Sequence, residues 1–227
     1  MKKILQSALA AALLLGAGAA QAQLSAGHIL LTGSAGYSSE KDGVGDNSRI
    51  YSTGEVSPQA GYFIVDNLAI GVRLSYGGSS FERKMKSQDT TWSEKNTTTA
   101  IDFGPFVRYY KPVGEHAAFF GQLAAGFGSS TEKREYSGPN FPGQPTFKDK
   151  KYSMLAAGLS PGFTFFPTDH FGLEVSMGGL MYSKSKLKDK PDNSTDTWED
   201  DSTATSLEAR FGLQDLRIGA TWYLGGK

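Results

Sequence analysis

Apolar residues alternate with small or polar ones along most of the chain after residue 28, and this alternation restricts the possible folds more than any other feature. The side chains of a β-strand point alternately to its two faces, so an alternating run predicts a strand with one apolar face. The clearest run has Leu68, Ile70, Val72, Leu74 and Tyr76 against Ala69, Gly71, Arg73, Ser75 and Gly77. An all-β chain of eight strands is predicted by eight such runs, at residues 29–38, 55–64, 68–77, 101–110, 119–128, 155–165, 171–181 and 207–224.

The eighth run changes its alternation in the middle. Its apolar residues are odd-numbered up to Leu213 and even-numbered from Leu216 onwards. An extra residue in a strand bends it and reverses which parity points to which side. We therefore expect a bulge or a bend near Gln214 and Asp215.

The connections between the runs have two very different lengths. Those after the second, fourth and sixth runs are short turns, whereas the other four are long and polar, at residues 39–49, 78–97, 129–151 and 183–203. Short turns at one end, long loops at the other and an even number of strands are typical of outer-membrane barrels. An open sheet edge in lipid would leave backbone groups without hydrogen bonds, so the sheet must close. The sequence thus predicts an eight-stranded antiparallel up-and-down transmembrane β-barrel with short periplasmic turns and long extracellular loops.

The aromatic residues and the second face of the strands favour a membrane around this barrel. Aromatic residues gather near both ends of the runs, as expected at the two membrane interfaces. They are Tyr37, Tyr51, Tyr76, Phe127, Tyr152 and Tyr182 at the long-loop end, and Tyr62, Tyr109, Phe119, Phe165, Phe171 and Trp222 at the turn end. The second face carries Gly, Ala, Ser and Thr with scattered charges, which suits a narrow lumen. The alternative is a soluble periplasmic binding protein of lipocalin type, whose apolar face would line a core.

The first residues have the composition of an export signal. Lys2 and Lys3 precede an apolar run that extends to Leu15, and small residues follow up to Ala22. This order is typical of a cleavable signal peptide, so we assign residues 1–22 to the signal and 23–227 to one barrel domain. The 23 basic and 23 acidic residues give no net charge, which argues against a nucleic-acid partner. The absence of cysteine excludes disulfides and thiolate chemistry.

Several short segments resemble the outer-membrane β-barrel domain family, to which the small eight-stranded barrels of Gram-negative bacteria belong. The segments are 57–63, 66–71, 104–110, 160–162 and 169–180. The resemblance covers nearly all of the chain after the signal and implies a place in the outer membrane, but no particular substrate. The closing residues Arg217, Gly219, Trp222 and Leu224 look like the terminal signal that the outer-membrane assembly machinery recognises.

The histidines do not suggest an enzyme. Enzymes that resemble small outer-membrane barrels place their histidine sites near the cell exterior, whereas His28, His116 and His170 all belong to the turn end. A serine–histidine–acid set cannot be drawn at the long-loop end, and general-base chemistry without histidine is uncommon. We expect no enzymatic activity, no catalytic residues and no cofactor or metal site.

Six charged residues share the lumen-facing parity and form the main candidate site. They are Glu55, Arg73, Asp102, Arg108, Glu174 and Arg217. An eight-stranded barrel is just wide enough for side chains to fill it, and buried charges must be paired. We expect an ion-pair network that plugs the lumen, in which Glu174 pairs with Arg217 or with Arg108. The alternative is that these charges line a conducting path.

The long loops are the expected place for any binding, because barrels carry variable function on loops. Acidic residues in the last loop could bind a divalent cation, but they lack a fixed ligand spacing, so a solvated loop is the better interpretation; they are Asp189, Asp192, Asp196, Glu199, Asp200 and Asp201. Lysines near the loop bases suit anionic lipopolysaccharide; they are Lys148, Lys150, Lys151, Lys184, Lys186, Lys188 and Lys190. The prediction is a structural or surface-interaction protein among outer-membrane lipids, with a narrow channel for small solutes as the alternative.

Overall fold

The computed structural model of the chain describes residues 24–44, 47–87, 90–138, 149–188 and 203–225. The predicted signal peptide at residues 1–22 lies outside these residues, as do Lys148, Lys190 and the acidic residues 189–201 of the last loop. No helix among the described residues is long and apolar enough to span a membrane.

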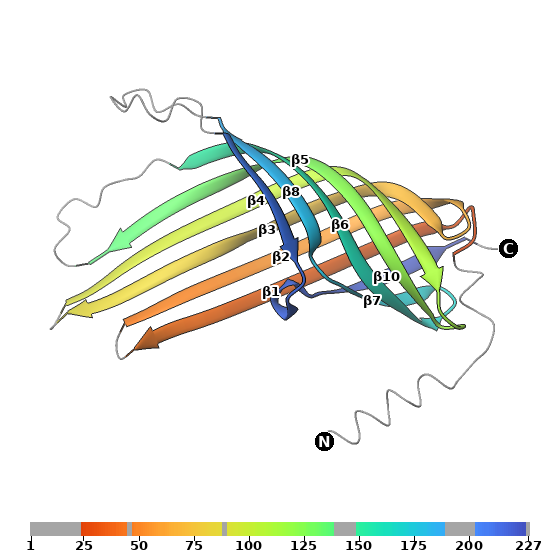
Figure 1. Cartoon of the computed structure of the whole chain (residues 1–227), viewed down its shortest axis with the longest axis horizontal. Coiled ribbons are helices and arrows are strands. Elements are labelled where there is room, and N and C mark those ends of the chain that lie inside the picture. The colour runs from red at the N-terminus through yellow and green to blue at the C-terminus, as the bar shows by residue number, and fades with distance from the viewer. Residues whose placement is uncertain (1–23, 45–46, 88–89, 139–148, 189–202, 226–227) are drawn as a thin grey trace, which may run out of the picture.

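Ten strands and one short helical turn make up the described chain (Figure 1). The strands are β1 (Ile29–Val44), β2 (Asn47–Val65), β3 (Leu68–Ser87), β4 (Thr90–Pro112), β5 (Ala117–Ser137), β6 (Lys150–Thr168), β7 (Phe171–Ser176), β8 (Gly179–Leu187), β9 (Thr203–Arg210) and β10 (Arg217–Leu224). The single-turn 3-10 helix η1 is Leu213–Asp215.

Eight of these strands close into a ring, which confirms the predicted barrel. Consecutive strands pair antiparallel from β1 to β7; β7 then pairs with β10, and β10 pairs with β1. The first and last strands meet over seven residue pairs, from Ile29–Leu224 to Ala35–Ile218. The two remaining strands extend the wall outward, since β8 pairs with β6 and β9 pairs with β8.

The strands reach further than the alternation of apolar residues predicted. Residues 39–49 and 78–97 were expected to be loops, but nearly all of them belong to β1–β2 and β3–β4. The pairing continues to Val44–Asn47 in one hairpin and to Ser87–Thr90 in the other. Both faces of these extensions are mostly polar because they project beyond the membrane, so no regular apolar periodicity marks them. The loop assignment of these segments was wrong for this reason.

Two interruptions divide the seventh and eighth predicted strands, which become β7 with β8 and β9 with β10. The bend predicted near Gln214 and Asp215 is confirmed, since η1 and its flanks separate β9 from β10. The break between β7 and β8 was not predicted. It covers Met177 and Gly178, and β8 starts at Gly179, whose φ of +81° is rare for other residues. A side chain there would also collide with the Leu159 carbonyl oxygen.

The apolar parity of the strands faces outward and the small, polar parity faces the lumen. On β3, Val72 and Leu74 are 48% and 41% exposed, whereas the alternate residues Ala69 and Ser75 are 0% and 5% exposed. The lipocalin-type alternative is therefore wrong, because its apolar face would be the buried one. Tyr51 was wrongly placed in the aromatic belt, since it is on the lumen parity of β2 and lines the lumen cavity.

Candidate functional site

Four aromatic side chains close the lumen at the end that carries the short turns. Phe63 of β2, Tyr110 of β4, Phe166 of β6 and Tyr223 of β10 are each 0% exposed. The ring of Phe63 lies 5.8 Å from that of Tyr110, and the ring of Phe166 lies 5.6 Å from that of Tyr223. Because these residues come from four different strands around the barrel, their rings meet in the middle of the lumen. We call this group the aromatic floor.

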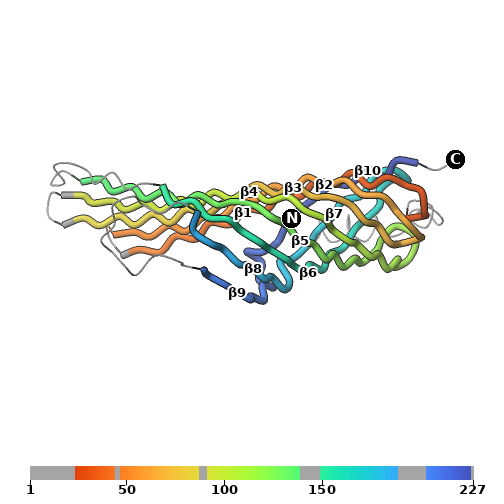
Figure 2. Tube along the Cα trace, turned by 90° about the horizontal axis from the view of Figure 1, so that it is seen from above, coloured from red at the N-terminus to blue at the C-terminus, as the bar shows by residue number. Residues whose placement is uncertain are grey.

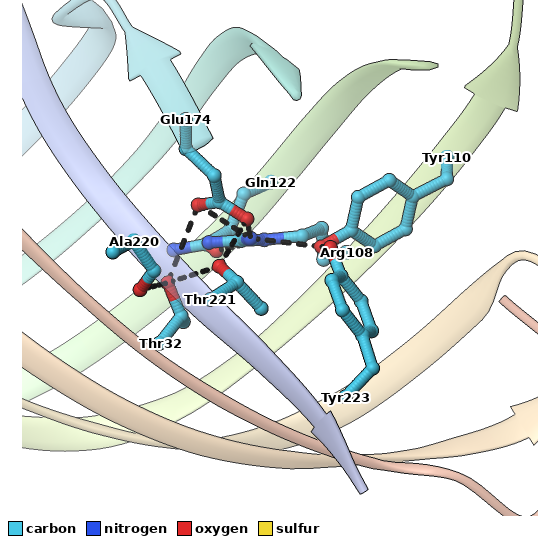
Figure 3. Close-up of polar contacts among 8 residues, drawn as sticks. All are labelled: Thr32, Arg108, Tyr110, Gln122, Glu174, Ala220, Thr221 and Tyr223. Carbon is cyan, nitrogen blue, oxygen red and sulfur yellow. Dashed lines mark hydrogen bonds and ion pairs between the residues drawn. The ribbon is translucent and has the colours of Figure 1, made fainter. Parts of the chain in front are cut away.

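A buried ion pair lies next to the aromatic floor, on the side of the Tyr110 and Tyr223 hydroxyl groups (Figure 3). Arg108 Nη1 lies 2.8 Å from Glu174 Oε1 and 3.0 Å from Glu174 Oε2, and the two side chains are 3% and 4% exposed. Burying a charged group costs roughly several kcal/mol unless the group is paired with an opposite charge and its other hydrogen-bonding positions are filled. Arg108 and Glu174 come from β4 and β7, so the pair bridges strands that are not neighbours in the wall.

Neighbouring side chains fill further hydrogen-bonding positions of this pair. Thr221 and Thr32 donate to Glu174, at 2.5 and 3.3 Å. Arg108 donates to Gln122 Oε1 at 2.7 Å and to the Tyr110 hydroxyl at 2.9 Å. The Arg108 guanidinium also lies 4.4 Å from the centre of the Phe120 ring, a distance that suits a cation–π contact.

Two further ion pairs lie in the lumen, and they are more exposed. Arg73 contacts Asp102 at 2.6 Å on the neighbouring strands β3 and β4. Arg217 contacts Glu55 at 2.8 Å, and Glu55 also accepts a hydrogen bond from Ser75 at 3.0 Å. Arg217 must pass over β1 to reach β2, and it does so at Gly36, where a Cβ atom would lie only 3.1 Å from Arg217 Cγ.

The structure therefore brings the six predicted lumen charges together as three pairs. The sequence left two partners open for Glu174, and the structure places Arg108 beside it and Arg217 beside Glu55. Sequence reasoning missed the uncharged members Thr32, Gln122 and Thr221. They share the lumen parity of their strands, so a search for polar residues on that parity would have found them, though not their partners.

The outer half of the lumen contains a cavity of about 790 Å³. Its lining is dominated by small and hydroxyl-bearing residues, including Ser57, Gly77, Ser79, Ala100 and Gly158. Short side chains cannot reach across the barrel, so they leave this space empty. The expectation that side chains fill the lumen is thus wrong for the outer half, while Arg108 and the aromatic floor fill the other half.

The residues assigned to the assembly signal lie on β10. Trp222 and Leu224 are 52% and 44% exposed on the outer face of the barrel, and the Trp222 ring packs edge-on against Phe171 at 5.0 Å. Gly219 is on the lumen-facing side of β10, and a Cβ atom there would lie 2.8 Å from the Gly33 carbonyl oxygen. Recognition of these residues by the assembly machinery stays a prediction.

The backbone carbonyls of all three histidines bond to residues of the aromatic floor. Those of His28, His116 and His170 accept hydrogen bonds from the amides of Phe63, Phe166 and Tyr223. Each histidine therefore lies at the turn end of the barrel, away from the lumen cavity. Within the described ranges, no three His, Cys, Asp or Glu residues are grouped so that they could hold a metal ion.

Comparison with known proteins gives one family and several structural neighbours. The family model described as "Outer membrane protein beta-barrel domain" matches residues 8–214. Neisserial surface protein A is 10% identical over 87% of this chain and 97% of its own, with a TM-score of 0.35. The attachment invasion locus protein Ail of Yersinia pestis is 16% identical over 87% and 95%, with a TM-score of 0.31. No curated protein matches the sequence.

Proposed function

We propose, from the premise that this chain belongs to the outer membrane protein beta-barrel domain family, that it acts at the cell surface through its outer strands and loops and that it does not conduct solutes. The resemblance noted in the sequence is confirmed by this membership, and the protein is one of the outer membrane.

The observation that carries the proposal is the contrast between the two ends of the lumen. At the turn end the four rings of the aromatic floor are fully buried, and Arg108 and Glu174 fill the layer above them. At the other end the lumen widens into a cavity of about 790 Å³. A solute that entered from outside would meet tightly packed rings, since protein interiors are packed as densely as organic crystals.

The outer strands carry lysines that suit the anionic head groups of lipopolysaccharide. Lys184 and Lys186 are exposed on the outward parity of β8, immediately beyond Tyr182 at the height assigned to the outer interface, and the exposed Lys188 follows the end of the strand. Lys151 of β6 is also exposed, and its carbonyl accepts a hydrogen bond from the Lys188 amide. Each lysine near an anionic membrane surface contributes roughly 1 kcal/mol of attraction. These residues support lipopolysaccharide as a surface partner.

Catalysis is not part of the proposed role. The six predicted lumen charges are engaged in ion pairs. The three histidines lie at the turn end, on the opposite side of the aromatic floor from the lumen cavity. Two carboxylates of the cavity lining, Glu40 and Asp215, are outside these pairs, but no histidine lies on their side of the aromatic floor to complete a catalytic set.

Ion conductance tests the proposal directly. The purified barrel, inserted in a planar phospholipid bilayer in molar salt, should give no steady single-channel current. Insertion should be verified on the same sample by the resistance of the folded barrel to unfolding by detergent before it is boiled. A steady ohmic current from the unmodified protein would support the narrow-channel alternative instead.

A further inference from the structure

The seam between the first and last strands is closed for only part of its length. β1 pairs with β10 up to Ala35–Ile218, and beyond this point residues 36–44 of β1 pair only with β2. On the other side, β9 pairs only with β8. Within the described residues no pairing joins β1 to β9, so the wall has a lateral opening in its outer half.

The cause of this opening is the interruption of the last strand. Residues 211–216, which include η1, turn between β9 and β10 and are held by a hydrogen bond from the Gly212 amide to Asp215 Oδ2 at 3.1 Å. This turn takes β9 out of line with β10. β9 then runs beside β8, away from the long extensions of β1 to β4 (Figures 1 and 2).

The lumen cavity reaches both sides of the opening. Its lining includes Gly36 and Ser38 of β1 and Ser206 of β9. The four arginines of the lining are each paired with a carboxylate, as Arg73–Asp102, Arg108–Glu174, Arg217–Glu55 and Arg210–Glu208. Two further lining carboxylates, those of Glu40 and Asp215, have no arginine among these pairs. Such a lining disfavours an anion and suits an uncharged group rich in hydroxyls.

A second cavity, of about 920 Å³, lies on the outer face of the wall beside the opening. Gly54 and Gly78 are directly opposite each other on β2 and β3, and their missing side chains hollow this face. The exposed side chains of Tyr37, Tyr76 and Ile218 border the hollow. We call it the outer groove. It is mostly apolar and lies at the height of the outer aromatic belt, to which Tyr37 and Tyr76 belong.

Gly36 and Tyr37 line both cavities, at the point where the seam ends. We propose that the lumen cavity and the outer groove form one binding site for a single-chain amphiphile with an uncharged, hydroxyl-rich head. The head occupies the lumen cavity, the chain passes over the free edge of β1, and the tail lies in the outer groove. Backbone groups of that edge have no strand partner on the open side, so they can hydrogen-bond to the head group.

Titration with n-octyl-β-D-glucoside below its micelle concentration tests this site. The full barrel is held in phospholipid nanodiscs, and the backbone amide NMR signals of β1, β2 and β9 are followed. We expect saturable shifts on the two edges of the opening. Glucose alone supplies only the head of the ligand and octanol alone only the tail. Each should bind at least about tenfold more weakly than octyl glucoside, because it lacks the contacts of the other half.

Two variants fill the two halves of the site. A Cβ atom at Gly54 would lie 3.7 Å from the Tyr37 ring, an ordinary contact distance, so Gly54→Val fits the backbone and fills the outer groove. Ala100→Phe fills the lumen cavity. Each should weaken binding of octyl glucoside roughly tenfold, because Gly54→Val denies about two methylene groups of the tail their burial and Ala100→Phe displaces the head group from its hydrogen bonds. Gly121→Val is the matched control, because it adds the same side chain to β5, where a Cβ atom would meet nothing within 4 Å.

The possible results separate the proposal from its competitors. Saturable binding that is lost in both filled variants and kept in Gly121→Val supports it. Glucose binding as tightly as octyl glucoside would mean a sugar site in the lumen alone, and equally tight octanol a tail site alone; either result overturns the two-part site. Absence of saturable shifts, or equal weakening by Gly121→Val, also overturns it. None of these results depends on whether the barrel conducts.

Discussion

Glu174→Gln should lower the free energy of unfolding by about 3–5 kcal/mol, the usual cost of leaving one partner of a buried ion pair without its counter-charge. Arg108 is only 3% exposed, so its charge would remain largely buried beside a neutral amide. Thr221 and Thr32 would also lose a charged acceptor. The measurement is equilibrium unfolding in urea of the barrel refolded in lipid vesicles, followed by tryptophan fluorescence.

Two controls distinguish the buried charge from a general effect of substitution. Glu55→Gln breaks the more exposed pair with Arg217 and should cost about 1 kcal/mol or less. Combining Arg108→Met with Glu174→Leu removes both charges and should recover much of the lost stability, since apolar replacements of whole buried pairs are often neutral. An unfolding midpoint for Glu174→Gln equal to that of the unmodified protein would show that the pair contributes nothing.

Phe63→Ala should destabilise the barrel by about 3–5 kcal/mol and should also let ions pass. The Phe63 ring is fully buried and lies 5.8 Å and 6.3 Å from the rings of Tyr110 and Tyr223. Its removal leaves a hole in the centre of the aromatic floor, and the other rings are fixed to strands that cannot move inward. Bilayer conductance and urea unfolding on the same preparation measure the two effects.

The conservative substitution Phe63→Leu serves as the control for this variant. Leucine keeps most of the apolar volume, so it should cost less stability and leave the floor closed. If Phe63→Ala folds and remains as impermeable as the unmodified barrel, the aromatic floor is not what seals the lumen. The layer of Arg108 and Glu174 would then be the seal, and Arg108→Met with Glu174→Leu would be the next protein to measure.

The architecture could be predicted from the sequence because lipid imposes a simple pattern on a barrel wall. Each strand that crosses the membrane must alternate, as Val72 and Leu74 do with Arg73 and Ser75. The hairpin ends could not be predicted in the same way, since water surrounds both faces of residues 39–49 and 78–97. The change of parity near Gln214 did predict the bend, because the lipid-facing parity must be restored after it.

The charges of the lumen could be predicted as a set but not as pairs. Parity alone places Arg108, Glu174 and Arg217 inside the barrel. Which of them meet depends on the stagger between strands, and two-residue periodicity contains no information on stagger. The empty outer half was missed for a related reason: an inward glycine or serine looks the same in a sequence whether the opposite wall fills the space or not.

Labelling of single cysteines tests the central claim, an outward-open lumen sealed towards the periplasm. The natural chain contains no cysteine, so each introduced thiol is the only target for a membrane-impermeant maleimide. Ser79→Cys places the thiol in the lumen cavity, Ala118→Cys places it in the buried layer at the aromatic floor, and Glu115→Cys places it in the exposed turn beyond that floor. In intact cells we expect labelling of Ser79→Cys alone, with Glu115→Cys labelled only after the outer membrane is permeabilised. Labelling of Ala118→Cys as fast as Ser79→Cys in intact cells, or none at Ser79→Cys, would contradict the account.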